Sequence, residues 1–342
     1  MNIETLKTTA KQMVAPGKGI LAADESSGTI KKRFDAVGVE DSEENRRQYR
    51  QTLLTTSGLG EYISGVILYD ETLRQKDDNG TSFAEMLSKN GILPGIKVDA
   101  GAKDMALHPS EKVTEGLDKL RERLKEYREL GARFAKWRAV ITIGDGIPTE
   151  SCVNANAHAM ARYAALCQEA DIVPIVEPEV LMDGEHTIER CFEVTEEVLE
   201  ETFEELSRQR VLLEGTILKA SMVIAGKKAT KQAPIEEVAD ATVRVLTTEV
   251  PKELAGIVFL SGGQSDEQAT ANLNKMNQIE SHPWPLSFSY GRALQNSALK
   301  IWAENPKTNV AKAQTALLFR SKMNALATQG KYSDEMEKGR PY

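Results

Sequence analysis

The sequence predicts an α/β fold, a single eight-stranded parallel β/α (TIM-type) barrel with extra N- and C-terminal helices. Eight short apolar runs recur along the 342 residues, each starting near a glycine or turn and ending in polar residues, as buried parallel strands do. Stretches of helical periodicity separate them. No G-x-G-x-x-G turn follows the first run, so a closed barrel is favoured over an open dinucleotide-binding sheet.

The first expected strand is 19–24 (GILAAD), where a glycine opens an apolar run that an aspartate closes. The other seven follow the same plan, in the order 65–70, 95–99, 134–138, 173–179, 215–219, 256–261 and 286–292.

Amphipathic stretches with few helix breakers lie between these strands. The clearest cover 116–132, 159–170, 189–209 and 234–250, and terminal helices are expected near 2–14 and at 309–327. Residues 1–330 should therefore form one barrel domain with terminal helices, and 331–342 a flexible C-terminal tail.

Composition restricts the class of protein. Hydrophobic residues make up 41% and charged residues 27%, the balance of a globular chain with a large core, and the net charge of −8 argues against broad nucleic-acid binding. No run is apolar enough for a signal peptide or a membrane span. The three cysteines are unclustered, which disfavours a disulfide framework, so a reducing cytoplasm is expected. The four histidines match no zinc spacing, so no metal and no cofactor are expected.

Charged residues close several of the expected strands, where barrels of this type carry their active sites. Period-2 alternation puts the two charged residues at the end of a strand on one face, which can point into the barrel. Such a cluster is costly to desolvate and indicates a catalytic task; the alternative is an ion-pair network that only stabilises the rim. The residues are Lys97, Asp99, Lys136, Arg138, Glu177 and Glu179.

Lys219 is the best candidate for a nucleophilic amine, because it ends an apolar strand and has no charged neighbour in sequence. A lysine amine attacks a carbonyl only when neutral, and a nearby cation beside an apolar wall lowers its pKa. Lys136 or Lys97 across the barrel would supply that cation. An iminium at Lys219 would act as the electron sink when the C3–C4 bond of a ketose breaks.

Two phosphate sites are predicted at the barrel mouth. The loops after the last two strands most often hold phosphate in these barrels, through backbone amides and arginine, although a glycine pair alone usually makes only a turn. A second basic group follows the first strand, with a helix N-cap and solvated face as the alternative. The residues are Ser261, Gly262, Gly263, Tyr290, Gly291 and Arg292 for one site, and Ser26, Thr29, Lys32 and Arg33 for the other.

These strand-end motifs, in this order, resemble class I fructose-1,6-bisphosphate aldolases from about residue 11 to 332. The resemblance implies reversible cleavage of fructose 1,6-bisphosphate to dihydroxyacetone phosphate and glyceraldehyde 3-phosphate in glycolysis and gluconeogenesis, without metal, by a homotetramer. The motifs are GILAADES with Asp24, FAKWR with Lys136, VPIVEPE with Glu177, LEGTILK with Lys219, FLSGGQ with Ser261 and SYGRAL with Arg292.

The resemblance implies specific roles for these residues. Lys219 would form the Schiff base, while Glu177 moves protons during carbinolamine formation and loss. Lys136 would stabilise charge near them, and Asp24 would engage the C4 hydroxyl. Glu179 joins the catalytic set. Ser261, Gly262 and Arg292 would bind the phosphate on C1, and the cluster from Ser26 to Arg33 would bind the other phosphate. Lys97 and Arg138 join the substrate-binding residues.

The chain departs from the family pattern in a few places. Ala220 and Ser221 replace a proline and an asparagine, Thr29 replaces a serine, and the tail is shorter but still ends in tyrosine. Tyr342 is therefore predicted to take part in proton transfer after cleavage, since the tail can span on the order of 40 Å at about 3.3 Å per residue; the alternative is a frayed terminus. Rival functions are a Schiff-base aldolase for another ketose phosphate, and a scaffold protein that kept the barrel but lost the chemistry.

Overall fold

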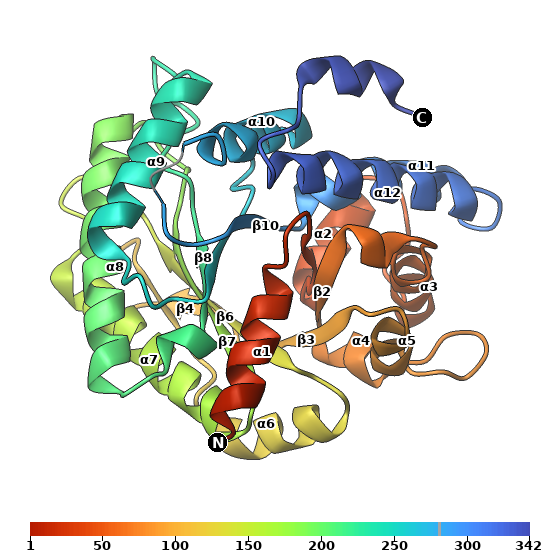
Figure 1. The fold of residues 1–342 in the computed structure, drawn as a ribbon, viewed down its shortest axis with the longest axis horizontal. Helices are drawn as coiled ribbons and strands as arrows, with labels where there is room; N and C mark the ends of the chain where they lie inside the picture. The colour runs from red at the N-terminus through yellow and green to blue at the C-terminus, as the bar shows by residue number, and fades with distance from the viewer. Residues whose placement is uncertain (280–281) are drawn as a thin grey trace.

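The computed structural model describes residues 1–279 and 282–342 and confirms the predicted barrel (Figure 1). Its eight parallel strands close in the order β1-β10-β9-β8-β7-β6-β3-β2, and β1 pairs with β2 to complete the ring. The strands are β1 (Gly19–Ala23), β2 (Ile63–Leu68), β3 (Leu93–Lys97), β6 (Phe134–Ile141), β7 (Val173–Val180), β8 (Ile217–Ala220), β9 (Gly256–Phe259) and β10 (Leu286–Tyr290).

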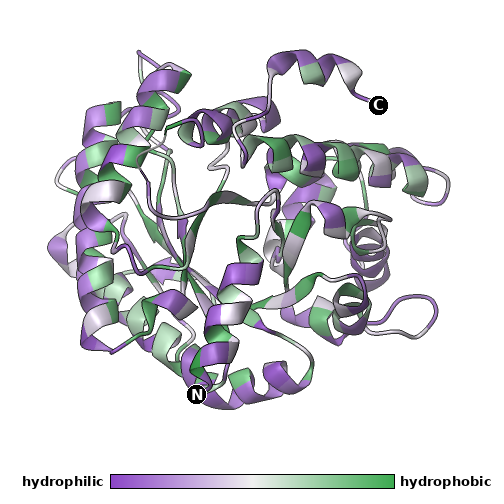
Figure 2. Cartoon of the chain, viewed as in Figure 1, coloured by the Kyte–Doolittle hydropathy of each residue, from purple (hydrophilic) through white to green (hydrophobic). Residues whose placement is uncertain are grey.

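Helices surround the barrel, with green apolar stripes along them in Figure 2. They are α1 (Ile3–Met13), α2 (Ser27–Asp35), α3 (Glu43–Leu54), α4 (Asp70–Arg74), α5 (Phe83–Lys89), α6 (Leu120–Glu129), α7 (Glu150–Glu169), α8 (Ile188–Arg208), α9 (Ile235–Glu249), α10 (Asp266–Met276), α11 (Arg292–Glu304) and α12 (Val310–Ala327). The 3-10 helices in the described part of the chain are η1 (Leu59–Glu61), η2 (Leu213–Gly215) and η3 (Asp334–Gly339).

All eight predicted strands are confirmed, with ends shifted by at most three residues. The expected helix at 159–170 is the second half of α7, which begins earlier because the Thr149 side chain accepts a hydrogen bond from the Cys152 amide and caps its start. The sequence did not predict the short antiparallel hairpin of β4 (Ala102–Asp104) and β5 (Lys112–Thr114) beyond β3. Three-residue strands are too short to produce a visible alternation.

One end of the barrel is filled by apolar side chains. Leu6 and Met13 of α1 pack against inward-facing residues such as Ile175, and Figure 1 shows α1 lying across the barrel. A Cβ atom at Gly95 would lie 2.2 Å from the ring of Phe134, and one at Gly65 would lie 2.9 Å from it. Gly65 within β2 and Gly95 within β3 therefore make room for the ring of Phe134 inside the barrel, and charged residues occupy the opposite end.

The C-terminal tail packs on the outside of α10 and α12. Glu337 of η3 forms an ion pair with the fully buried Arg320 of α12 at 2.5 Å, and Arg340 pairs with the first turn of α10. The ring of Tyr342 packs edge-on against Phe319, with 6.0 Å between centroids. Ion pairs thus hold the segment for which the sequence predicts flexibility.

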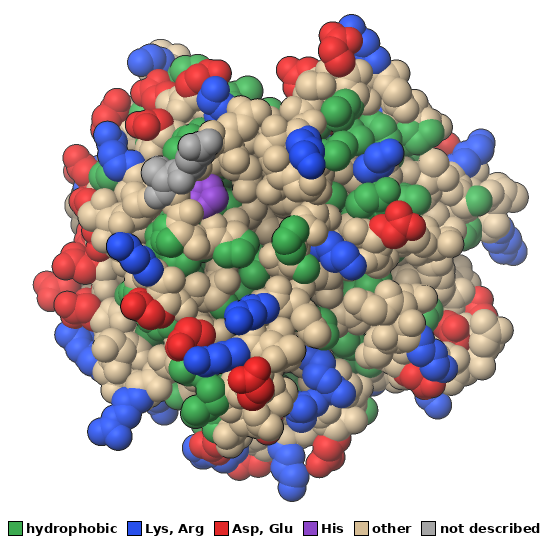
Figure 3. Space-filling view, viewed as in Figure 1, with side chains coloured by type: hydrophobic (Ala, Val, Ile, Leu, Met, Phe, Trp, Pro, Cys, Tyr) green, Lys and Arg blue, Asp and Glu red, His purple; other side chains and the backbone are tan. Residues whose placement is uncertain are grey.

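Acidic and basic side chains are interspersed on the face shown in Figure 3, without a broad basic surface there. None of the helices within residues 1–279 and 282–342 is both long and apolar enough to cross a bilayer.

Candidate active site

A cavity of about 500 Å³ lies at the C-terminal ends of the strands, where the sequence places the active site. All predicted site residues line it except Asp99, Gly263, Tyr290 and Tyr342. The predicted residues that the structure brings together there are Asp24, Ser26, Thr29, Lys32, Arg33, Lys97, Lys136, Arg138, Glu177, Glu179, Lys219, Ser261, Gly262, Gly291 and Arg292.

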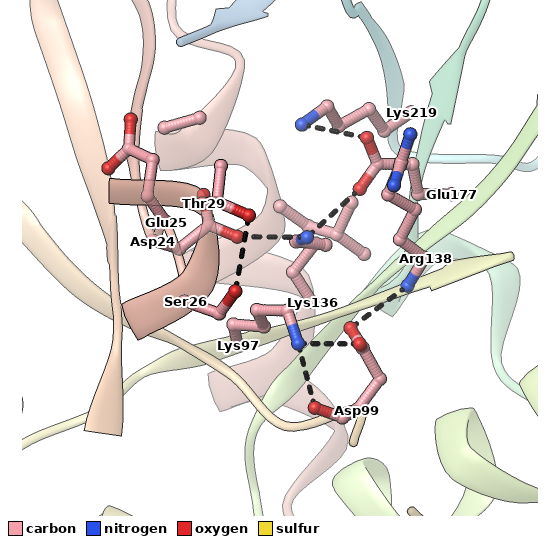
Figure 4. Close-up of polar contacts among 12 residues, drawn as sticks. Asp24, Glu25, Ser26, Thr29, Lys97, Asp99, Lys136, Arg138, Glu177 and Lys219 are labelled. Carbon is pink, nitrogen blue, oxygen red and sulfur yellow. Dashed lines mark hydrogen bonds and ion pairs between the residues drawn. The ribbon is translucent and has the colours of Figure 1, made fainter. Parts of the chain in front are cut away.

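Four buried charges form a chain at the bottom of this cavity (Figure 4). Lys219 Nζ of β8 lies 3.0 Å from Glu177 Oε1 of β7, and Glu177 Oε2 lies 3.2 Å from Lys136 Nζ of β6. Lys136 Nζ in turn lies 2.9 Å from Oδ2 of Asp24, just after β1. Lys136, Glu177 and Lys219 come together because β6, β7 and β8 are neighbouring parallel strands whose carboxyl ends meet at one edge of the barrel, whereas Asp24 reaches Lys136 from β1 on another side of the ring.

Opposite charges in this chain stabilise each other's ionised forms. Burial alone would lower the pKa of Lys136, but the carboxylates of Asp24 and Glu177 outweigh it and hold this pKa well above its ordinary value. Burial alone would raise the pKa of Asp24, but Lys136 and Lys219 hold it well below its ordinary range. The pKa of Glu177 is likewise lowered, because Lys136, Lys219 and Arg138 outweigh its burial.

The sequence places a second cation, Lys136 or Lys97, across the barrel from Lys219. The structure adds that the carboxylate of Glu177 lies between Lys219 and Lys136. The period-2 pattern identified the inward face of each strand. It contained no information on the order of charges around the ring, which depends on the register between strands.

Two further ion pairs lie near the rim of the cavity. Lys97 Nζ donates to Oδ1 of Asp99 at 2.5 Å and to the Asp99 carbonyl at 2.7 Å, so two residues that the sequence places on one face form an ion pair. Arg138 instead pairs across strands with Glu179. Burial would lower the pKa of Arg138, but the Glu179 carboxylate outweighs it and raises this pKa.

The loop after β9 and the start of α11 form one predicted phosphate site. Gly262 and Gly263 both have positive φ, 56° and 85°, which glycine adopts readily and which lets a ligand approach the backbone closely. Gly263 lies outside the cavity lining but beside it, since a Cβ there would be 3.3 Å from Nη2 of Arg292. Ser261 is buried at the edge of this loop.

The structure corrects the expectation for Tyr290. Its ring is fully buried outside the cavity, and its hydroxyl donates to the Ala269 carbonyl at 3.0 Å. The side chains of β10 alternate, so Ser289 faces the cavity in its place. Tyr342 also lies outside the cavity, because its tail is held on α10 and α12.

The second basic cluster lies at the start of α2. The hydroxyls of Ser26 and Thr29 are 3.2 Å apart, and Lys32 and Arg33 follow one turn later. Both hydroxyls and both basic side chains line the cavity.

Sequence reasoning missed the buried network that holds Arg33. Glu25 pairs with Arg33 and, through its other oxygen, with Arg50 of α3 at 2.5 Å. Gln295 of α11 donates to Glu25 at 3.0 Å. The only local signal for this network was the position of Glu25 next to Asp24. Arg50 and Gln295 are far away in sequence, so no local pattern connects them to Glu25.

The histidines serve other purposes where the structure shows their contacts. His158 Nδ1 of α7 lies 2.8 Å from Glu205 of α8, on the outer layer of helices. Across residues 1–279 and 282–342, His, Cys, Asp and Glu form no group of three or more suited to hold a metal ion.

Comparisons with known proteins place this site in a family. The family model "Fructose-bisphosphate aldolase class-I" matches residues 5–341. The chain is 62% identical to the probable class 1 fructose-bisphosphate aldolase of Xanthomonas axonopodis pv. citri, over 97% of this chain and 99% of that protein. It is 52% identical to cytosolic fructose-bisphosphate aldolase 6 of Arabidopsis thaliana, over 98% and 94%.

A solved structure agrees with these matches. The fructose-bisphosphate aldolase of Plasmodium falciparum, crystallised with TRAP and a small-molecule inhibitor, superposes with a TM-score of 0.95 at 52% identity, covering 96% of this chain and 95% of that one. The chain therefore belongs to the class I fructose-bisphosphate aldolases, and it cleaves fructose 1,6-bisphosphate reversibly to dihydroxyacetone phosphate and glyceraldehyde 3-phosphate through a lysine Schiff base.

Proposed function

We propose that Lys219 is the lysine that forms the Schiff base in this chain and that Glu177 is the group that moves protons to and from it. The observation that carries this proposal is the 3.0 Å contact between Lys219 Nζ and Glu177 Oε1 inside the cavity, with both side chains about 95% buried or more. A carboxylate at that distance can accept a proton from the ammonium, which leaves a neutral amine to attack the ketone.

Lys136 is a poorer nucleophile than Lys219. Two carboxylates surround its ammonium, and the raised pKa of Lys136 keeps it charged at neutral pH. A permanently charged lysine at this position would stabilise the negative charge that develops on oxygen during carbinolamine formation. The structure thus supports the division of roles that the family resemblance implies.

Asp24 is the candidate base for the C4 hydroxyl. Its lowered pKa means that the carboxylate is ionised and able to accept a proton, although a low pKa makes it a weak base. The two phosphates of the substrate bring negative charge into the cavity, which raises the proton affinity of Asp24 when the substrate is bound. Substrate binding would therefore activate this base.

The two phosphate sites suit the two ends of one substrate. Ser261, Gly262 and Arg292 line the cavity, and so does the cluster from Ser26 to Arg33. The reacting groups Lys219 and Asp24 line the same cavity. We assign the first site to the phosphate on C1 and the cluster from Ser26 to Arg33, with Lys97, to the phosphate on C6.

A matched pair of variants tests the proton-transfer role. Glu177→Gln should slow adduct formation with dihydroxyacetone phosphate by roughly two to four orders of magnitude, the range for loss of a general acid–base group. Glu179→Gln, on the same strand and at the rim, should affect adduct formation far less. Equal rates of adduct formation in the two variants would contradict the assignment of Glu177.

The rival functions make different predictions. A scaffold protein would form no adduct at all, and a Schiff-base aldolase for another ketose phosphate would form one but turn over fructose 1,6-bisphosphate poorly. The buried set of lysines and carboxylates argues against a scaffold, because such charges are costly to bury without a task.

We also propose that the enzyme is a cytoplasmic homotetramer that binds sugar phosphates and no nucleic acid. The support is the family, the cytosolic relative in Arabidopsis thaliana, the three buried free cysteines and the net charge of −8. Sedimentation equilibrium of the purified protein would measure the subunit number directly.

A further inference from the structure

Two loops beside the phosphate site after β9 are joined by backbone hydrogen bonds. The loop after β8 donates from Gly226 to the His186 carbonyl at 2.9 Å, and from Lys227 to the Met182 carbonyl at 2.8 Å. Lys228 donates to the Gly184 carbonyl at 2.9 Å. The loop between β8 and α9 is therefore fixed to the loop between β7 and α8.

Two glycines allow this close approach. A Cβ at Gly226 would lie 2.5 Å from the carbonyl oxygen of Gly184, so no larger residue fits there without moving the backbone. Gly184 itself has a φ of 127°, which disfavours other residues. The position of the next residue, Lys227, is thus set by backbone contacts on either side of it.

These contacts place the ammonium of Lys227 at the phosphate site. A Cβ at Gly263 would lie 3.0 Å from Lys227 Nζ and 3.3 Å from Nη2 of Arg292, so both cations approach the same glycine. Lys227 Nζ lies 3.1 Å from Oδ1 of Asp183, and the two side chains are 42% and 68% exposed. An exposed pair of this kind is weak.

We propose that Lys227 is an additional cationic ligand for the phosphate that Ser261, Gly262 and Arg292 bind, and that its ammonium exchanges Asp183 for the phosphate when substrate enters. This inference rests on the proposed function, which places the phosphate on C1 at this loop. A phosphate carries more charge than a carboxylate and offers three acceptor oxygens, so it competes well for an ammonium that only one exposed carboxylate holds.

A matched pair of lysine variants tests this. Lys227→Met should raise KM for fructose 1,6-bisphosphate about two- to fivefold, the range for a partly exposed charged pair, with kcat nearly unchanged. The inhibition constant of inorganic phosphate should rise by a similar factor, and both effects should shrink at high ionic strength. Lys228→Met removes the same charge from the next residue, which donates its amide to Gly184, and should leave both constants unchanged.

A third variant tests the exchange with Asp183. Asp183→Asn should lower the inhibition constant of phosphate in the wild-type background, because it removes the competitor, and should have no effect in the Lys227→Met background. If Lys227→Met and Lys228→Met have equal KM and equal inhibition constants for phosphate while the covalent adduct on Lys219 still forms, the role of Lys227 is overturned but the proposed function is not. Absence of the adduct in the wild-type protein would instead overturn the proposed function.

Discussion

Removing Arg50 tests the network that holds the second phosphate site. Glu25 and Arg50 are 4% and 3% exposed, so Arg50→Met leaves a buried carboxylate with one charged partner fewer. Breaking a buried ion pair costs about 3–5 kcal/mol, and because Arg33 and Gln295 still contact Glu25 we expect the lower end, about 3 kcal/mol. At about 2.1 cal/mol/K per residue the unfolding entropy of this chain is about 0.7 kcal/mol/K, so Tm should fall by about 4 °C.

The pH dependence of this loss has a definite sign. Burial would raise the pKa of Glu25, but Arg50 and Arg33 outweigh it and lower this pKa below its ordinary value of about 4.3. A lowered pKa stabilises the folded state above the ordinary value, and this stabilisation is lost as the pH falls below it. The difference in Tm between wild type and Arg50→Met should therefore be full at pH 7 and shrink below about pH 4.

Calorimetry at several pH values, with a control from the same helix, measures the effect. Arg47, also in α3, pairs with the exposed carboxylates of Glu44 and Asp78, so Arg47→Met should cost less than about 1 kcal/mol. Because Glu25, the carboxylate that holds Arg33, loses one of the side chains that fix its position, Arg50→Met should also raise KM for fructose 1,6-bisphosphate more than KM for fructose 1-phosphate. Equal losses of stability in Arg50→Met and Arg47→Met would show that the buried pair of Glu25 and Arg50 contributes no more to stability than an exposed one.

Three further predictions concern the active site and the tail. Arg292→Ala should raise KM for fructose 1,6-bisphosphate roughly 30-fold, or about 2 kcal/mol, the lower end for a truncated charged pair because Arg292 is exposed; an unchanged KM would contradict it. Activity should survive exhaustive treatment with EDTA, since the proposed chemistry uses Lys219 and no metal, and zinc-restored activity would exclude the Schiff-base mechanism. Deleting Tyr342 should leave adduct formation intact but slow exchange of the C3 proton of dihydroxyacetone phosphate if the tail leaves Phe319 during turnover, whereas wild-type exchange rates would exclude a role for this tyrosine.

The sequence predicted the barrel well because each strand carries its own local signal. Glycine opens several of the apolar runs and charged residues close them, and the structure explains both features: Gly65 and Gly95 make room for Phe134, and the charges gather at the opposite end. Patterns of this kind involve residues that are close together in the chain, so they can be recognised in a single sequence. The hairpin at 102–114 was missed because its strands are too short to show any alternation.

The candidate site was predictable where its residues end strands and less so where contacts are long-range. Period-2 alternation indicated the inward faces, but only the register between strands shows that Glu177 separates Lys219 from Lys136. The same alternation, applied through the end of β10, would have favoured Ser289 over Tyr290. Lys227 joins the phosphate site through two paired loops, which no local pattern reveals.

The most direct test of the central claim is to find which lysine forms the covalent intermediate. The purified enzyme is incubated with dihydroxyacetone phosphate, reduced with borohydride, digested and mapped by mass spectrometry. We expect a single adduct on Lys219, together with loss of activity, because Lys219 faces a proton acceptor while two carboxylates hold Lys136 in its charged form. An adduct on Lys136 or Lys97, or none at all, would contradict it.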